Sequence, residues 1–252
     1  MKFARLATGI VLALIGLNSS LRSEPGTPNV SKAADWSGLF IGAQGGGAWA
    51  NTGWTFPIDS YFTLPNGRRS FDTEPAGGFA GGHITLNHQM GPVVLGAELA
   101  INGGAIDAVD IGRFTPLFPN DRFETRVDAF GKLVGRLGFA HDNFLLYATG
   151  GYARGHANFS ALSAPPGGGV FGQVKKHLDG WTAGGGLEYL LTPVVVLGVE
   201  YEYTQLQGAT RAVQTTGTPS NDPFVLHINT IELQAVSARI SFKLDQPPPG
   251  PE

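Results

Sequence analysis

The stretch that decides the fold is GWTAGGGLEYLLTPVVVLGVEYEY, residues 180–203. In its second half, valine, leucine and tyrosine occupy the odd positions from 195 to 203, whereas glutamate occupies positions 200 and 202. An apolar–polar alternation with period two indicates a β-strand with one apolar face. Trp181, Ala183, Leu187 and Tyr189 form a similar face in the first half, and Leu191-Thr192-Pro193 separates the two runs. The stretch therefore predicts an antiparallel hairpin with a short turn.

The rest of the chain contains similar runs. Counting this hairpin, we predict eight strands, over residues 38–49, 77–88, 92–102, 123–140, 143–155, 178–190, 194–206 and 228–244. Clear alternation appears in the runs 92–102, 123–140 and 228–244 as well. The run at 143–155 is almost entirely apolar, so its two faces cannot be assigned. These runs predict an all-β fold.

The connections between the predicted strands alternate in length. Short turns lie at 89–91, 141–142 and 191–193, and connections of roughly twenty residues lie at 51–76, 103–122, 156–177 and 207–227. Structureless loops of this length are uncommon in compact soluble domains. Outer-membrane barrels combine long extracellular loops with short periplasmic turns and an even strand number. We therefore predict an eight-stranded antiparallel transmembrane up-and-down β-barrel in the cell outer membrane, with both termini periplasmic.

A soluble eight-stranded barrel, with its apolar face inward, is the alternative. Two features besides the loop lengths favour an outward apolar face. Aromatic residues lie near strand ends on that face, as in an aromatic girdle facing lipid: Trp181, Tyr189, Tyr201, Tyr203 and Phe242. The opposite face carries nearly balanced charges, which we predict to lie inside the barrel and to pair there: Glu98, Arg126, Asp128, Lys132, Arg136, Glu188, Glu200, Glu202 and Arg239, with Lys243 near the chain end.

The ends of the chain differ from the barrel. Residues 1–23 have a basic start and a 12-residue apolar run from Leu6 to Leu17, which indicates a secretory signal peptide. We expect a flexible lead-in at 24–35, the barrel at 36–244 and a proline-rich periplasmic tail at 245–252.

Composition excludes several classes of protein. The chain has 252 residues, no cysteine and a formal net charge of -3. A disulfide scaffold and a Cys-ligated metal site are therefore excluded. The lack of a basic excess argues against a nucleic-acid partner. Its 37 glycines lack the period of collagen, and the glycine clusters do not precede a helix as phosphate loops do.

Three motifs resemble the "porin family" outer-membrane β-barrel proteins of alphaproteobacteria. They are DWSGLFIG at 35–42, LLYATGGYA at 145–153, and the hairpin of residues 180–203 with its LTP turn. The resemblance covers about residues 35–244 and implies an OmpA-like transmembrane domain. It also implies insertion by the barrel-assembly machinery, which reads a terminal aromatic residue; here the last strand ends Phe242-Lys243-Leu244.

The resemblance implies a structural envelope protein, and some family members bind haemin or are called porins. We expect a structural barrel presenting four long extracellular loops, with lipid and lipopolysaccharide as partners, no cofactor or metal, and no enzymatic activity. A small porin is one alternative. A surface receptor for haemin or a similar extracellular ligand is another, with His156, His177 and His227 as loop residues for it.

Overall fold

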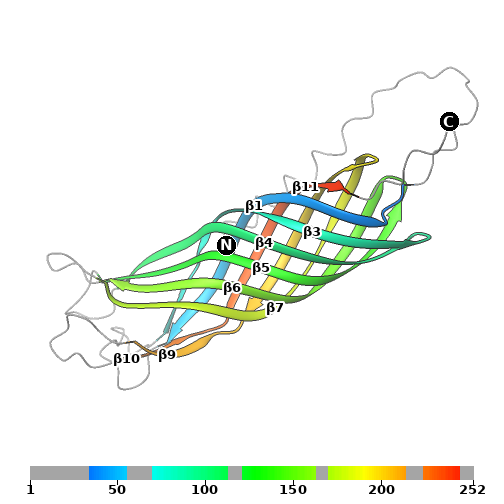
Figure 1. Ribbon diagram of the computed structural model, residues 1–252. Helices are drawn as coiled ribbons and strands as arrows, with labels where there is room; N and C mark the ends of the chain where they lie inside the picture. The colour runs from blue at the N-terminus through cyan, green and yellow to red at the C-terminus, as the bar shows by residue number, and fades with distance from the viewer. Residues whose placement is uncertain (1–33, 56–69, 113–120, 163–169, 214–223, 245–252) are drawn as a thin grey trace, which may run out of the picture. The chain divides into compact units, whose positions relative to one another are not determined.

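A computed structural model describes residues 34–55, 70–112, 121–162, 170–213 and 224–244 (Figure 1). The expected signal peptide, nearly all of the lead-in and the proline-rich tail lie outside these residues. Within the described residues, no helix is long and apolar enough to cross a membrane.

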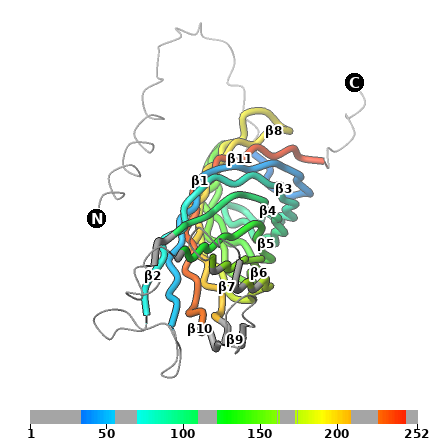
Figure 2. The backbone as a smooth tube through the Cα atoms, turned by 90° about the vertical axis from the view of Figure 1, so that its left-hand side faces the viewer, coloured from blue at the N-terminus to red at the C-terminus, as the bar shows by residue number. Residues whose placement is uncertain are grey.

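Eight long strands make up the wall among the described residues: β1 (Gly38–Thr55), β3 (Ala76–Met90), β4 (Val93–Gly112), β5 (Asp121–His141), β6 (Phe144–Leu162), β7 (Val170–Thr192), β8 (Val195–Leu206) and β11 (Ile231–Lys243). Each pairs antiparallel with its neighbours, and β11 pairs with both β8 and β1. The sheet is therefore a closed up-and-down barrel (Figures 1 and 2). The predicted eight-stranded fold is confirmed.

Three tight turns lie at one end of the barrel, here called the turn end. In the turn between β3 and β4, Gly91 has a φ of 60°, and in the turn between β5 and β6, Asp142 has a φ of 50°. Glycine adopts this left-handed conformation freely, and aspartate tolerates it better than most residues. The opposite end is called the loop end.

At the loop end, the strands are longer than the sequence predicted. Connections of about twenty residues were expected at 103–122 and 156–177, but β4 continues to Gly112 and β6 to Leu162. The antiparallel pairing of these strands with their neighbours extends over the added residues. Three short strands extend the wall further: β2 (Ser70–Thr73) and β10 (Phe224–Ile228) pair with β1, and β9 (Ala209–Val213) pairs with β10.

The outer surface of the wall carries a band of exposed apolar side chains. The alternate side chains of the long strands point outward and expose large apolar groups, among them Ile84, Leu86, Leu99, Leu133, Leu137, Leu146, Leu187, Leu197, Val199 and Ile240. Such a band is the surface that a transmembrane barrel turns to lipid. The soluble alternative, which requires an apolar interior and a polar exterior along each strand, is thereby rejected.

The lumen is filled by side chains in three layers. At the turn end, an apolar layer contains Trp36, Phe40, Val94, Tyr147, Leu145, Leu190 and Val196. At the loop end, a larger apolar layer contains Trp54, Ile106, Phe123, Val127, Phe130, Phe159, Leu178, Leu206, Ile231 and Leu233. Buried charged residues of the strands form a separate, polar set, described below.

Strand β5 changes which of its side chains point inward. Phe130, Lys132, Val134 and Arg136 are buried, but so are Phe123, Thr125 and Val127, which have the opposite parity. The change coincides with shifts of register on both sides of the strand, at Gly103/Ile106 of β4 and Val127/Ala129 of β5. A bulge inserts an unpaired residue and re-aims the side chains beyond it.

This bulge corrects two sequence predictions. Arg126 and Asp128 were expected inside the barrel, but Arg126 is exposed and Asp128 partly exposed on the outer face, where they pair at 2.6 Å. Simple alternation carried through from Arg136 put them on the wrong side, because it took no account of the extra residue.

Candidate functional site in the lumen

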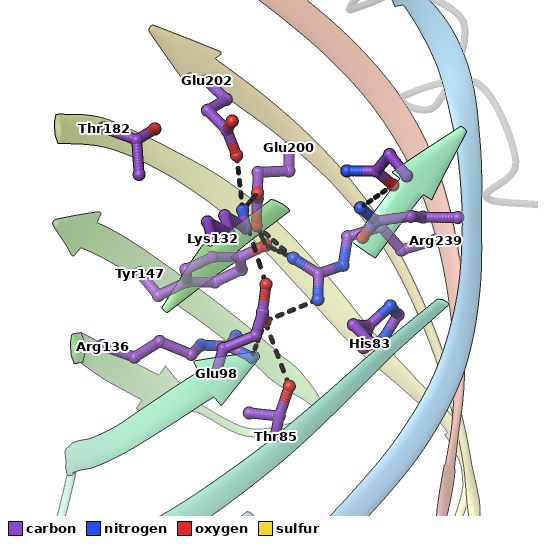
Figure 3. Close-up of polar contacts among 12 residues, drawn as sticks. His83, Thr85, Glu98, Lys132, Arg136, Tyr147, Thr182, Glu200, Glu202 and Arg239 are labelled. Carbon is purple, nitrogen blue, oxygen red and sulfur yellow. Dashed lines mark hydrogen bonds and ion pairs between the residues drawn. The ribbon is translucent and has the colours of Figure 1, made fainter. Parts of the chain in front are cut away.

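The candidate site is an ion-pair network across the middle of the lumen. It contains seven of the nine charged residues predicted for the interior, and all seven are buried: Glu98 on β4, Lys132 and Arg136 on β5, Glu188 on β7, Glu200 and Glu202 on β8, and Arg239 on β11. Figure 3 shows six of these side chains, all except Glu188, pointing toward one another from different strands of the wall. We call this set the lumen network.

Glu98 is the acceptor at its centre. Its Oε2 lies 2.6 Å from Nη2 of Arg239 and 3.3 Å from Nη1 of Arg136. Thr85 donates its hydroxyl to the same oxygen at 3.0 Å. Arg136 also reaches Glu188, with 2.9 Å between Nη2 and Oε2. One carboxylate thus joins two guanidinium groups that come from different strands.

Lys132 connects a second group of carboxylates. Its ammonium Nζ lies 2.6 Å from Oε2 of Glu202 and 3.4 Å from Oε1 of Glu98, and it also donates to Glu200. Glu200 in turn accepts from Arg239 and from the hydroxyl of Tyr147, the latter at 2.7 Å.

Tyr147 links the network to the apolar layer at the turn end. Its ring belongs to that layer, and the Arg136 guanidinium lies over the ring at 3.9 Å from the centroid. A cation over an aromatic face is stabilised by the ring quadrupole. Four carboxylates face three cations, so the network is close to neutral, as a buried cluster of charges must be to offset its desolvation.

The sequence did not predict the contact between His83 and Ser241. Nε2 of His83 lies 2.8 Å from the Ser241 hydroxyl, and both side chains are buried in the lumen. They belong to β3 and β11, which flank β1 and both face Gly42 in the register. A Cβ added at Gly42 would overlap His83, so the missing side chain leaves the space in which they meet. The sequence signal that could have indicated this contact is Gly42, a glycine that lies opposite a polar residue on each neighbouring strand.

The three histidines proposed for a ligand are not brought together. His156 and His177 face each other on β6 and β7, with ring centroids 4.6 Å apart. His227 lies on β10, which pairs with β1 and β9 rather than with β6 or β7. No cluster of three or more metal-ligating side chains occurs within the ranges that the structure describes.

The predicted girdle residues occupy both ends of the outer surface. Trp181, Tyr201 and Tyr203 lie toward the loop end, and Tyr189 and Phe242 toward the turn end. The Trp181 indole donates to Gln205 at 2.9 Å, and the Tyr201 hydroxyl donates to Gln234 at the same distance. Each ring therefore exposes an apolar body and engages its polar atom, which suits a membrane interface.

The barrel geometry agrees with a comparison against protein families. Residues 11–233 match the model of the outer membrane protein beta-barrel domain. The chain belongs to this outer-membrane β-barrel family. The match covers seven of the predicted strands in full and the start of the eighth, so membership rests on nearly the whole wall of the barrel.

Relatives of this outer-membrane barrel come from alphaproteobacteria. The 31 kDa outer-membrane immunogenic protein of Brucella melitensis is 31% identical over 190 residues, covering 73% of this chain and 78% of the relative. The 22 kDa outer membrane protein of Rhizobium leguminosarum is 26% identical over 179 residues, covering 71% and 68%. These relatives and the fold place the protein in the outer membrane.

Solved structures similar to this barrel have much lower sequence identity. Neisserial surface protein A is 12% identical with a TM-score of 0.41, and the alignment covers 82% of this chain and 98% of that one. OprG from Pseudomonas aeruginosa is 10% identical with a TM-score of 0.44, and the alignment covers 81% and 96%.

Proposed function

We propose that the protein is a structural, non-conducting barrel of the outer membrane, which carries its extended loop end outside the cell. The observation that carries this proposal is the lumen network between two apolar layers. An eight-stranded barrel has an interior only wide enough to be filled by side chains. Here that interior holds cross-lumen ion pairs in its middle and packed aromatic rings on either side.

The two apolar layers support the proposal of a blocked lumen independently of the charged residues. At the loop end, the Trp54 indole packs against Phe123 and Phe159, with ring centroids 5.4 and 5.7 Å apart. Its Nε1 donates to the Thr125 hydroxyl at 3.0 Å. At the turn end, Trp36 is fully buried. An ion crossing this lumen would have to displace the packed side chains of both layers.

The porin alternative is therefore disfavoured. Liposome swelling with a small sugar tests it, with wild type compared with a variant that carries Trp54→Ala and Phe123→Ala. We expect no swelling above protein-free liposomes for wild type. Sugar entry through the wild-type protein would overturn the structural proposal.

The proposal also excludes an enzyme. Among the residues that the structure describes, the arrangement nearest to a catalytic pair is His83 and Ser241, but a substrate cannot reach either, since both are buried beside the lumen network. Nδ1 of His83 has no hydrogen-bond partner within the described part of the chain, so no carboxylate orients the ring as in a catalytic triad.

The proposed orientation places the turns and both chain termini in the periplasm. The chain has no cysteine, so a single introduced thiol reports its own side of the membrane. We expect a membrane-impermeant maleimide to label Arg122→Cys, an exposed position at the loop end of β5, in intact cells and to leave Asp142→Cys unlabelled. The reverse pattern would invert the orientation.

A further inference from the structure

The outer face of β5, β6 and β7 changes character toward the loop end. On the side nearer the turn end, Leu133, Tyr152 and Trp181 form an apolar and aromatic surface. Nearer the loop end, the residues that face each other on β6 and β7 are polar: Arg154 with Asp179, His156 with His177, Asn158 with Lys175, and Ser160 with Gln173. The bulge of β5 places Arg126 and Asp128 beside them on the same surface.

A shallow groove lies within this polar surface. Its volume is about 260 Å³, and its lining comes from three adjacent strands: Glu124, Arg126, Asp128, Asn158, Ser160, Gln173 and Lys175. We call it the outer-face groove. It contains two cations, two carboxylates, two amides and one hydroxyl.

Contacts within the groove hold its polar groups in place. Asp128 accepts from both Arg126 and Asn158. The Gln173 amide lies 3.4 Å from the Ser160 hydroxyl. Lys175, by contrast, forms no ion pair with any residue that the structure describes. The groove therefore offers donors and acceptors from five side chains that contact one another, together with the Lys175 ammonium and the Glu124 carboxylate.

The position of the groove along the membrane normal indicates which layer of the membrane it faces. Asn158 lies six positions beyond Tyr152 along β6, which is roughly 20 Å at the usual rise of a strand. At a strand tilt of about 40°, the groove lies about 15 Å beyond the aromatic surface along the membrane normal. Because the hydrocarbon ends at the aromatic girdle, the groove faces the headgroup layer rather than acyl chains.

We propose that the outer-face groove binds the phosphorylated core saccharide of lipopolysaccharide in the surrounding leaflet. Sugar hydroxyls both donate and accept hydrogen bonds, which matches a groove lined by amides, carboxylates and a hydroxyl. A phosphate group would pair with the Lys175 ammonium. Arg154 lies on the same outer face, nearer the turn end. The acyl chains would lie on the apolar surface below. This inference rests on the proposed orientation, in which the loop end is outside the cell.

The test measures lipid retained by the full-length protein. Wild type is refolded in micelles free of lipopolysaccharide and mixed with rough lipopolysaccharide bearing a complete core, with lipid A alone, or with phosphatidylcholine. Native mass spectrometry then counts bound molecules. The variants are Lys175→Ala and Asn158→Ala, and the control is Lys243→Ala, which removes the same charge at the turn end.

We expect wild type and the Lys243→Ala control to retain rough lipopolysaccharide, and both groove variants to retain at least threefold less. Lipid A is expected to bind less than rough lipopolysaccharide and to be insensitive to the groove variants. Equal retention by groove variants and control would overturn the proposal. Equal binding of lipid A and rough lipopolysaccharide would also overturn it, because the core would then contribute nothing.

This result is separate from the test of the proposed function. Retention in micelles does not depend on a closed lumen, so sugar entry into liposomes would overturn the structural role and leave the groove result standing. Heat-modifiable gel migration of each variant shows whether the barrel is folded before retention is compared.

Discussion

Arg239 Nη2 lies 2.6 Å from Glu98 Oε2, although the two residues are 141 positions apart in the chain. Glu98 is on β4 and Arg239 is on the last strand, β11, which closes the barrel against β1. Their contact crosses the lumen, so it forms only when the wall is complete. The lumen network thus stabilises the closed sheet in addition to filling its interior.

Removing one buried cation should destabilise the barrel more than removing an exposed cation from the same strand. We expect Arg136→Ala to cost on the order of 3–5 kcal/mol, because it leaves the buried Glu188 carboxylate without its cation and removes one of the cations that contact Glu98. Arg126→Ala is the control, since its pair with Asp128 is largely exposed. Such a pair contributes about 0–1 kcal/mol.

Chemical unfolding in detergent micelles measures both free energies. Equal losses for Arg136→Ala and Arg126→Ala would show that the lumen network adds no stability beyond that of a surface ion pair.

Glycine at position 42 should be required for the inner packing. A Cβ there would overlap Nε2 of His83 and the carbonyl oxygen of Ile240. We expect Gly42→Ala to cost about 1–3 kcal/mol, the usual penalty for overpacking. Gly47→Ala on the same strand is the control, because its Cβ would be 4.0 Å from its nearest neighbour, the oxygen of Gly77. The thermal midpoint of heat-modifiable migration gives the comparison, and a Gly47→Ala loss as large as that of Gly42→Ala would refute the packing argument.

The four tryptophans should differ in their access to lipid, two being accessible from the membrane and two being enclosed in the lumen. Trp49 and Trp181 are 40% and 48% exposed on the outer surface, whereas Trp36 and Trp54 are 0% and 1% exposed inside. We expect brominated lipids to quench the fluorescence of a Trp36→Phe/Trp54→Phe variant strongly. A Trp49→Phe/Trp181→Phe variant should keep most of its fluorescence. Similar quenching of the two variants would mean that the inner and outer faces are wrongly assigned.

A pH-dependent contribution is expected at the turn end. Partial burial raises the pKa of Asp35, but the Ser37 backbone N–H, 3.0 Å away, and the Lys243 ammonium, 3.2 Å away, outweigh it and bring the pKa below its usual value. The stabilisation is therefore present above the unfolded pKa of about 3.9 and is lost as pH falls through the folded pKa.

The comparison for this site is wild type against Asp35→Asn. Because the carboxyl is mostly exposed, we expect wild type to be more stable by no more than about 1 kcal/mol at neutral pH. The difference should vanish once the pH lies below the folded pKa, where the carboxyl is protonated in both states. A difference that persists in acid would assign the effect to a cause other than the charge.

Local patterning predicted much of this fold. Alternation in β8 placed Glu200 and Glu202 inside and Tyr201 outside, because the side-chain period of a strand is two. The same reasoning failed at Arg126 and Asp128, where a bulge on β5 shifts the register. A bulge depends on how neighbouring strands pair, which one run of sequence does not reveal.

The contacts between strands were less accessible from the sequence. The hydrogen bond between His83 and Ser241 requires β3 and β11 to lie on either side of β1, a consequence of barrel closure. The extension of β4 and β6 was missed for a related reason. Glycine and asparagine are typical of loops, but the continued ladder with neighbouring strands keeps Gly103, Gly104 and Asn158 in the wall.

Single-channel recording of the wild-type, full-length protein in a planar lipid bilayer tests the central claim most directly. Insertion is verified by heat-modifiable migration of protein recovered from the same preparation. The sealed lumen predicts a flat baseline without discrete steps at either polarity. Reproducible, stepwise ion conductance through the wild-type barrel would contradict it.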